Sequence, residues 1–425
     1  MVETERAGVR GISEPGYALL SLEPAPFSPQ HSPIIEECDI SCAAAPAQTV
    51  EGMAERISAL FGVAFNDLIH VHVSLSQVPS PVKSIWLSST ASLPVLLPAF
   101  QCWSNRSPSL REMVCETLQS ITHRFLPERD DESTFRVNYQ GEVDASVDPG
   151  IAIAQLLDPD PLKPVFLTGL RLPILAELGF RCPSDLCTVA EPMEESNVQI
   201  NLTPKFSFVD LHIDYGADGV SALVGNCRKI WLLYPPSRNN LVAMRTVDGQ
   251  RGKLARIMHR LEGGIMVETT VAQSLYIPAG CIHATFTLQG GFLIARDFTT
   301  SISIGAISAY IASGLEGMLT PQAREVCWDW FSRCLDVSLA HGQFDRAIRA
   351  WMDAEPRLAT WASSHRYWRT AMRRIWDLYV QEIPEQCPCG TQGDAVPQDH
   401  LYSTHLKCLL PPSKIRRQKR SDVVY

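Results

Sequence analysis

Between about residues 165 and 300, short apolar runs alternate with turn residues, in a pattern typical of β-strands. Many short strands at such close spacing predict a β-sandwich or a β-barrel. The predicted strands are 198–202, 206–211, 230–234, 265–271, 274–277, 283–288 and 292–298.

Helical spacing of apolar residues replaces this pattern on both sides. Ser109 and Glu112 form a capping-box signature ahead of such spacing, which predicts a helix over 109–125. A Thr-Pro start and a terminal glycine predict another helix over about 320–342. Six of the nine tryptophans lie between 328 and 376, so these helices are predicted to bury an aromatic core or to pack against the β region.

These patterns predict a mainly β core with N-terminal helices and a C-terminal helical bundle, α+β overall. The first segment is rich in proline with little apolar periodicity, and it is predicted to be unstructured. The predicted division is 1–50, an unstructured segment; 51–164, a helical and mixed region; 165–300, the barrel; 301–382, the helical bundle; and 383–425, a zinc-binding segment with a basic tail.

Composition narrows the class of protein. With 45% hydrophobic and 20% charged residues among 425, the chain is typical of globular proteins and excludes collagen-like or coiled-coil structure. The net charge is −9 although the last fifteen residues carry +4, so the rest of the chain is acidic and favours a basic partner. Thirteen scattered cysteines without a secretory leader predict reduced thiols inside the cell, and no membrane segment is expected.

Candidate chemistry begins with His212 and Asp214, which are two residues apart in a predicted strand. Side chains at such spacing share a face, so the imidazole and the carboxylate can meet at one point. His283, at the start of another predicted strand, can supply a third ligand. Two histidines and one carboxylate are typical of non-haem Fe(II) oxygenases. The alternative for the first two residues is a hydrogen-bonded pair without a metal.

Lys229 lies among apolar strand residues, where its burial is costly unless an anion meets it. A dicarboxylate co-substrate would supply that anion. The alternative is a lysine on an edge strand that reaches solvent.

Three blocks of sequence carry a family resemblance: 210–216 (Asp-Leu-His-Ile-Asp-Tyr-Gly), 225–236, which includes the lysine, and 274–284. Together they resemble the JmjC domain family of Fe(II)- and 2-oxoglutarate-dependent oxygenases. Within it they are most similar to the branch of the histone demethylation proteins and plant-homeodomain-finger demethylases. The resemblance covers about 200–300 and implies a double-stranded β-helix, the cupin-like JmjC barrel.

The resemblance also implies roles for individual residues. His212, Asp214 and His283 would bind iron, Lys229 would pair with the distal carboxylate of 2-oxoglutarate, and Asp297 would lie near the iron. The implied activity is oxidation of lysine N-methyl groups on histones in the nucleus. A protein or RNA hydroxylase on the same fold is one alternative, and a non-catalytic interaction module in chromatin is the other.

Three positions depart from that branch of the family. Val209 stands where a threonine usually binds the co-substrate, Ala222 where a tyrosine usually contributes, and Asp297 where asparagine is usual. Each lost hydroxyl would weaken co-substrate binding by about 0.5–1.5 kcal/mol. These departures favour the interaction module.

The C-terminal segment contains a second set of candidate ligands, Cys387, Cys389, His400 and His405. Two thiolates and two imidazoles suit tetrahedral zinc. Cys408 competes as a ligand, and the alternative is a frayed segment without metal. The basic run 414–420 predicts a nuclear import signal or a nucleic-acid contact, with a solvated tail as the alternative.

Overall fold

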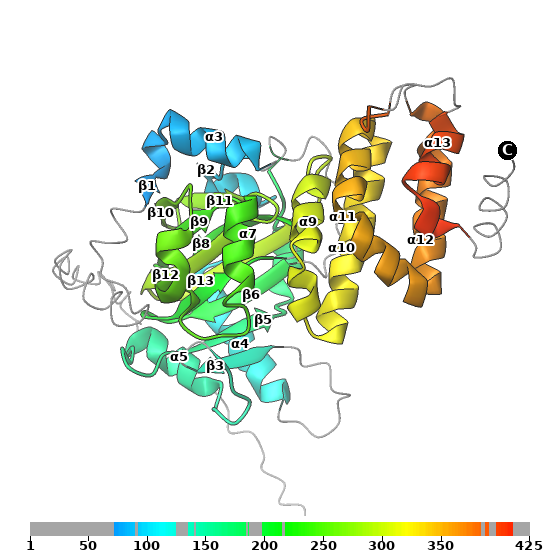
Figure 1. The fold of residues 1–425 in the computed structure, drawn as a ribbon. Helices are drawn as coiled ribbons and strands as arrows, with labels where there is room; N and C mark the ends of the chain where they lie inside the picture. The colour runs from blue at the N-terminus through cyan, green and yellow to red at the C-terminus, as the bar shows by residue number, and fades with distance from the viewer. Residues whose placement is uncertain are drawn as a thin grey trace, which may run out of the picture. The chain divides into compact units, whose positions relative to one another are not determined.

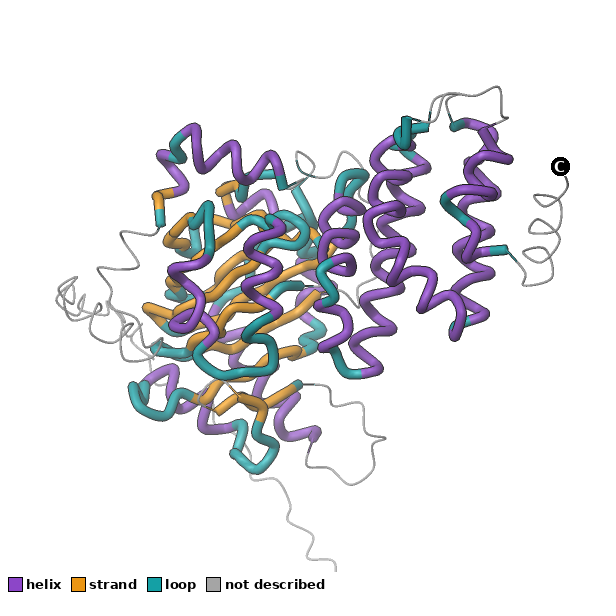
Figure 2. Tube along the Cα trace, in the orientation of Figure 1, coloured by secondary structure: helices purple, strands orange, loops and turns teal. Residues whose placement is uncertain are grey.

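The computed structural model describes residues 72–89, 92–124, 135–139, 142–183, 186, 198–214, 217–383, 387–390 and 397–410. The predicted segment 1–50 and the basic run 414–420 lie outside these residues. Stacked strands form the centre of the described part, with helices against them (Figures 1 and 2).

Thirteen strands are found in the described residues. Their bounds are β1 Val73–Ser74, β2 Val95–Pro98, β3 Arg136–Tyr139, β4 Glu142–Val143, β5 Val165–Leu170, β6 Val198–Thr203, β7 Phe208–His212, β8 Asp218–Val224, β9 Arg228–Tyr234, β10 Ile265–Thr269, β11 Gln273–Ile277, β12 Ile282–Gln289 and β13 Gly291–Phe298. They form a five-stranded sheet in the order β1-β10-β9-β12-β7 and an eight-stranded sheet in the order β2-β11-β8-β13-β6-β5-β3-β4. Except for the parallel pair β1 and β10, neighbouring strands are antiparallel.

The α-helices of the described residues precede, interrupt and follow these strands. Their bounds are α3 Ser80–Ser88, α4 Leu110–Arg124, α5 Gly150–Leu157, α6 Ile174–Leu178, α7 Arg238–Arg245, α8 Lys253–Ile257, α9 Ser303–Ala312, α10 Pro321–Ala340, α11 Phe344–Ser364, α12 Arg366–Tyr379 and α13 Pro397–Thr404. None of the described helices combines the length and the apolar character that a membrane span requires.

Strands β6 to β13 are consecutive in the chain and are shared between the two sheets. Strands β6, β8, β11 and β13 belong to the eight-stranded sheet, and β7, β9, β10 and β12 belong to the five-stranded sheet. This exchange between two facing antiparallel sheets is a cupin-like double-stranded β-helix. The predicted fold class, a mainly β core with flanking helices, is confirmed.

Alternating side chains explain why both faces of the five-stranded sheet are covered. In β12, His283, Thr285 and Thr287 face the other sheet, while Phe286 and its apolar neighbours pack against helices. In β9, Trp231 lies in the core between the sheets. Polar groups at alternate positions are therefore collected inside the barrel.

Helices cover the outer faces of both sheets. Apolar residues of α4, α5 and α6 pack on the eight-stranded sheet, and those of α7, α8 and α9 share one core cluster with the outer face of the five-stranded sheet. Helices α10 and α11 pack on α9, and α12 packs on α10 and α11. Six of the tryptophans pack within the C-terminal helices, including Trp328 stacked on Trp361 with ring centroids 5.0 Å apart. This aromatic core also continues onto the barrel, which confirms the prediction.

The predicted strands are confirmed with ends that shift by at most two residues. The helix expected over 109–125 is α4, and its capping box is formed. The Ser109 backbone N–H donates to Glu112 Oε2 over 2.7 Å, and the Glu112 N–H donates to Ser109 Oγ over 3.2 Å. The prediction of reduced thiols was wrong at Cys182, which is disulfide-bonded.

Candidate functional site

A bulge in β7 decides which of its side chains face the barrel interior. His212 pairs with His283 of β12, and Val209 pairs with Thr285. Between these two pairs, β7 advances by three residues while β12 advances by two, which is a β-bulge. As a result, Val209 and His212 both line the cavity between the sheets.

Asp210, within this bulge, has its carboxylate on the other side of the strand. It accepts hydrogen bonds from the backbone N–H groups of Lys253 over 2.7 Å and Leu254 over 3.0 Å, at the start of α8. Its backbone carbonyl accepts a hydrogen bond from His212 Nδ1 over 2.9 Å. Asp210 therefore fixes both the bulge and the orientation of the histidine ring.

A tight turn places His283 at the beginning of β12. The Cys281 N–H donates to the Pro278 carbonyl over 3.1 Å, and Gly280 has φ +72°. Its backbone conformation favours glycine, and a Cβ there would also make a tight contact, 3.1 Å from the Ala306 side chain. His283 Nδ1 donates to the Cys281 carbonyl over 3.1 Å.

His212, Asp214 and His283 converge on one point. Their ligand atoms lie within 4.8 Å of one another. The Asp214 oxygens are 3.8 Å from His212 Nε2 and 3.5 Å from His283 Nε2. Because both Nδ1 atoms donate to carbonyls, each Nε2 is left with a lone pair directed at the group. Donors at roughly 2.1 Å from one ion lie about 3–4 Å apart, so the residues present fit a metal.

Burial differs among these three residues. His283 is buried, and burial together with the neighbouring His212 lowers its pKa to about 4, which keeps the imidazole neutral as metal binding requires. The Asp214 side chain is 50% exposed. One side of the group is therefore open toward solvent.

Lys229 is buried inside the barrel, with 2% of its surface exposed. Its Nζ donates to Thr287 Oγ1 over 2.7 Å, and no carboxylate of the described residues pairs with it. Burial lowers its pKa, because the desolvated ammonium is unfavourable. Lys229 is not on an edge strand, since β9 lies between β10 and β12.

Asp297 of β13 lines the same cavity as His212 and Asp214. Gln199 Nε2 donates to its Oδ2 over 3.0 Å. Burial, followed by repulsion from the Asp214 carboxylate, raises the pKa of Asp297 to about 8. Near pH 7 the Asp297 carboxyl group is therefore neutral or only partly charged, and it shares the cavity with His212, Asp214 and His283.

The cavity between the sheets has a volume of about 110 Å³. Typical drug-sized ligands occupy pockets of roughly 300–1,000 Å³, so its ligand has to be small. Trp231 lines the cavity, whereas Lys229 does not. Lys229 lies two positions before Trp231 in β9, so its side chain is on the same face of the strand.

The expected position of Ala222 was wrong. Ala222 does not line the cavity but lies in the apolar core outside the eight-stranded sheet, where Ile294 is its partner on β13. Side chains alternate along a strand, and it is the neighbouring Ser221 of β8 that lines the cavity.

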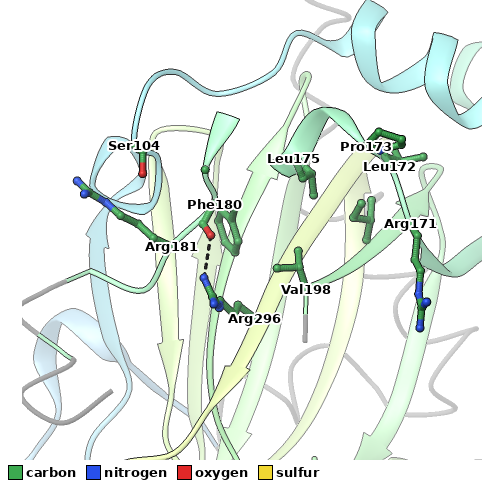
Figure 3. A pocket seen from close by; sticks show the side chains of 11 residues that line it. Ser104, Arg171, Leu172, Pro173, Leu175, Phe180, Arg181, Val198 and Arg296 are labelled. Carbon is green, nitrogen blue, oxygen red and sulfur yellow. Dashed lines mark hydrogen bonds between the residues drawn. The ribbon is translucent and has the colours of Figure 1, made fainter. Parts of the chain in front are cut away.

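A larger cavity of about 620 Å³ lies on that outer face (Figure 3). Arg171, Arg181 and Arg296 line it together with apolar residues, and Arg296 donates to the Phe180 carbonyl over 3.0 Å. None of the predicted site residues belongs to it. Neighbours in β13, Arg296 and Asp297, thus face different cavities.

The predicted C-terminal ligands form a separate group. Ligand atoms of Cys387, Cys389, His400 and His405 also lie within 4.8 Å of one another. Cys408 does not belong to this group.

Several polar residues around the barrel centre were missed from the sequence. Thr287 binds Lys229, and Gln199, Asn201, Ser221 and Thr285 line the cavity. A signal was available, because polar residues alternate with apolar ones in β6 and β12 where both faces of a strand are expected to be buried.

Comparison with known proteins finds relatives over part of the chain. This chain is 31% identical over 105 residues to the JmjC domain-containing histone demethylation protein 1 of Kluyveromyces lactis. The matched region covers 23% of this chain and 22% of that protein. The chain is 28% identical over 123 residues to the protein of the same name from Saccharomyces cerevisiae, covering 27% and 25%. The chain thus matches only about a quarter of each relative. No family model matches it.

Proposed function

We propose that this chain, which is related to the JmjC domain family, is an Fe(II)- and 2-oxoglutarate-dependent oxygenase that removes methyl groups from lysine in histones or other basic proteins. The observation that carries the proposal is the convergence of two imidazole Nε2 atoms and one carboxylate inside a barrel that also buries a lysine. Three protein ligands leave three positions of an octahedron for small molecules.

Lys229 supports the choice of co-substrate. A buried ammonium whose one partner among the described residues is a hydroxyl gains most from an anion, and the distal carboxylate of 2-oxoglutarate would supply one. Because Thr287 Oγ1 accepts from Lys229, its own proton is directed to another acceptor, and the same carboxylate can receive it. Both side chains share the inner face with His283 and Trp231, so the co-substrate would extend along that face.

When bound, iron with 2-oxoglutarate and oxygen supplies the oxidising power that removes hydrogen from a C–H bond. The protein's own residues position the metal ligands and exclude water from the cavity. Hydrogen bonds from Nδ1 to backbone carbonyls hold the two imidazole rings in their metal-binding orientation. Trp231, Ile277 and Leu293 give the cavity apolar walls that exclude water. The exposed side of Asp214 marks where a substrate side chain would enter.

Two observations support a basic protein substrate in the nucleus. The relatives are named for histone demethylation. The chain outside its basic end is acidic, which attracts cationic tails. In this proposal the basic run 414–420 contacts an import receptor or nucleic acid.

The test is an anaerobic titration of the purified chain with Fe(II) and 2-oxoglutarate, followed by oxygen and methylated histone peptides. A visible metal-to-co-substrate absorption band, succinate and formaldehyde are the expected results. Succinate without formaldehyde, together with an oxygen atom retained on the peptide in its mass spectrum, would identify a hydroxylase instead.

A non-catalytic interaction module is the second candidate, because Val209 and Asp297 both line the cavity where the co-substrate would bind. An apolar side chain and an additional acid disfavour an anionic ligand. Metal binding without any absorption band or succinate would support this candidate and contradict the oxygenase.

A further inference from the structure

The second Cys/His group lies within the C-terminal helices and shares no residue with the barrel centre. Its four side chains come from two short stretches, Cys387 and Cys389 from one turn, and His400 and His405 from α13 and the residue after it. The described ligand atoms all lie within 4.8 Å of one another.

A tight turn brings the two thiols together. The Gly390 N–H donates to the Cys387 carbonyl over 3.1 Å, and Gly390 has φ +76°. Pro388 takes the second position of this turn, where its fixed φ is preferred. The turn therefore sets the positions of Cys387 and Cys389 before any ligand is bound.

The end of α13 brings the imidazoles to the same place. The His405 N–H donates to the Leu401 carbonyl over 2.8 Å, so the helical turn continues past Thr404. The rings of His400 and His405 lie with centroids 5.2 Å apart. Both direct Nε2 at sulfur: His405 Nε2 is 3.3 Å from Cys387 Sγ, and His400 Nε2 is 3.3 Å from Cys389 Sγ.

From this geometry we propose that Cys387, Cys389, His400 and His405 bind one zinc ion in a closed structural site. Sulfur and nitrogen atoms on a tetrahedral zinc ion lie about 3.5 Å apart, given Zn–S near 2.3 Å and Zn–N near 2.0 Å. Four protein ligands leave no open position for a substrate, which distinguishes this site from the three-ligand centre in the barrel.

The site fastens the last described segment to the helical bundle. Leu401, Leu406 and Leu409 are buried in the same core as α11 and α12. The Trp351 Nε1 of α11 donates to the His405 carbonyl over 3.0 Å, so one ligand is anchored directly on the bundle. Zinc would cross-link the loop at 387–390 to α13 and so stabilise the packing of the three leucines on α11 and α12.

The test counts zinc in the purified full chain by mass spectrometry. To exclude zinc bound at the barrel, the count is made in a His212→Ala background. One zinc per chain is expected there, a loss of that zinc after the further change Cys389→Ser, and no loss after the control change Cys408→Ser. An unchanged count in Cys389→Ser would overturn the proposal.

A second measurement uses no variant of the site and so does not depend on how such a variant folds. The His212→Ala chain is loaded with cobalt(II) in place of zinc under reducing conditions. Intense visible bands of tetrahedral cobalt and a near-ultraviolet thiolate-to-cobalt band are expected. A weak octahedral spectrum without the thiolate band would overturn the proposal.

A third measurement tests the structural role. The melting temperature of the His212→Ala chain should fall on addition of a zinc chelator and should rise with the free zinc concentration. A melting temperature that is independent of zinc, in a chain that binds it, would contradict the fastening of α13. These results do not depend on oxygenase activity, so they stand or fall separately from the proposed function.

Discussion

The two ligand groups of this protein differ in number, origin and surroundings. The barrel group has three residues from β7, the turn after it and β12, separated by as many as 71 positions, and it lies in a cavity with one carboxylate half-exposed. The C-terminal group has four residues within 19 positions, and neither described cavity includes it. The first group is built on strands that hydrogen bonds and apolar cores already hold. The second joins a short segment with little core of its own. Metal loss should therefore remove chemistry from the first and stability from the second.

The largest effect is expected for Asp214→Ala. Loss of residues that only support a metal ligand costs 10–100-fold in affinity, so loss of a ligand should reduce iron binding and succinate formation by roughly 100-fold or more. Because the side chain is half-exposed, the free energy of unfolding of the metal-free chain should change by less than about 0.5 kcal/mol. Iron titration, succinate assays and thermal melting measure the three quantities.

Asp158→Ala, at an exposed acid after α5, is the matched control and should leave all three unchanged. A large drop in melting temperature for Asp214→Ala would break the comparison, since the barrel group would then be structural as well.

The next effect is expected for Lys229→Met. A hydrogen bond to a charged group contributes about 1.5–3 kcal/mol, so the dissociation constant of 2-oxoglutarate should rise roughly 10–100-fold. Iron binding should be retained. Without co-substrate, the variant should be as stable as the parent or more stable by about 1 kcal/mol, because methionine fills the site without a buried charge.

Co-substrate titration with the band of the anaerobic complex separates these outcomes. An unchanged dissociation constant would mean that Lys229 is a structural lysine satisfied by Thr287 alone. A strong loss of stability in Lys229→Met would likewise indicate that Lys229 has a structural role.

Much of this site could be predicted from the sequence because its signals are local. The spacing of His212 and Asp214 and the turn before His283 are visible in short stretches, and so are the polar interruptions of apolar strands. The apolar residues on either side of Lys229 indicated a buried lysine, but only the pairing of β9 with both β10 and β12 excludes the alternative of an edge strand. The seven predicted strands follow from the same local alternation.

Other features depend on pairing between distant strands. The bulge in β7 depends on its register against β12, which shifts between His283 and Thr285. This shift places Val209 and His212 on one face, although they are three residues apart. A shift of one residue reverses the face of every side chain, which is why Ala222 was placed in the cavity instead of Ser221. Strand β8 itself was missed, because Gly219 and Ser221 interrupt its apolar pattern.

A smaller effect is expected for Val209→Thr. Val209 lines the cavity beside Thr285, so a hydroxyl there can donate to the co-substrate and lower its KM about two- to tenfold. The control is Ala222→Ser, which adds a hydroxyl on the outer face of the eight-stranded sheet and should leave the KM unchanged. If both variants gave the same KM as the parent, the co-substrate would lie elsewhere in the barrel.

The smallest effect is a pH dependence that Asp297→Asn should remove. The pKa of Asp297 is raised to about 8 from 3.8, so between these values the folded chain holds a proton that the unfolded chain has lost. Stability from this group is therefore full below about pH 4 and falls as the pH rises toward 8. The melting temperature of the metal-free parent should fall by a few degrees more between pH 5 and 8 than that of Asp297→Asn. Asp158→Asn should follow the parent. Parallel pH profiles for all three chains would show that Asp297 is charged beside Asp214, and the open centre would then carry more negative charge than is proposed here.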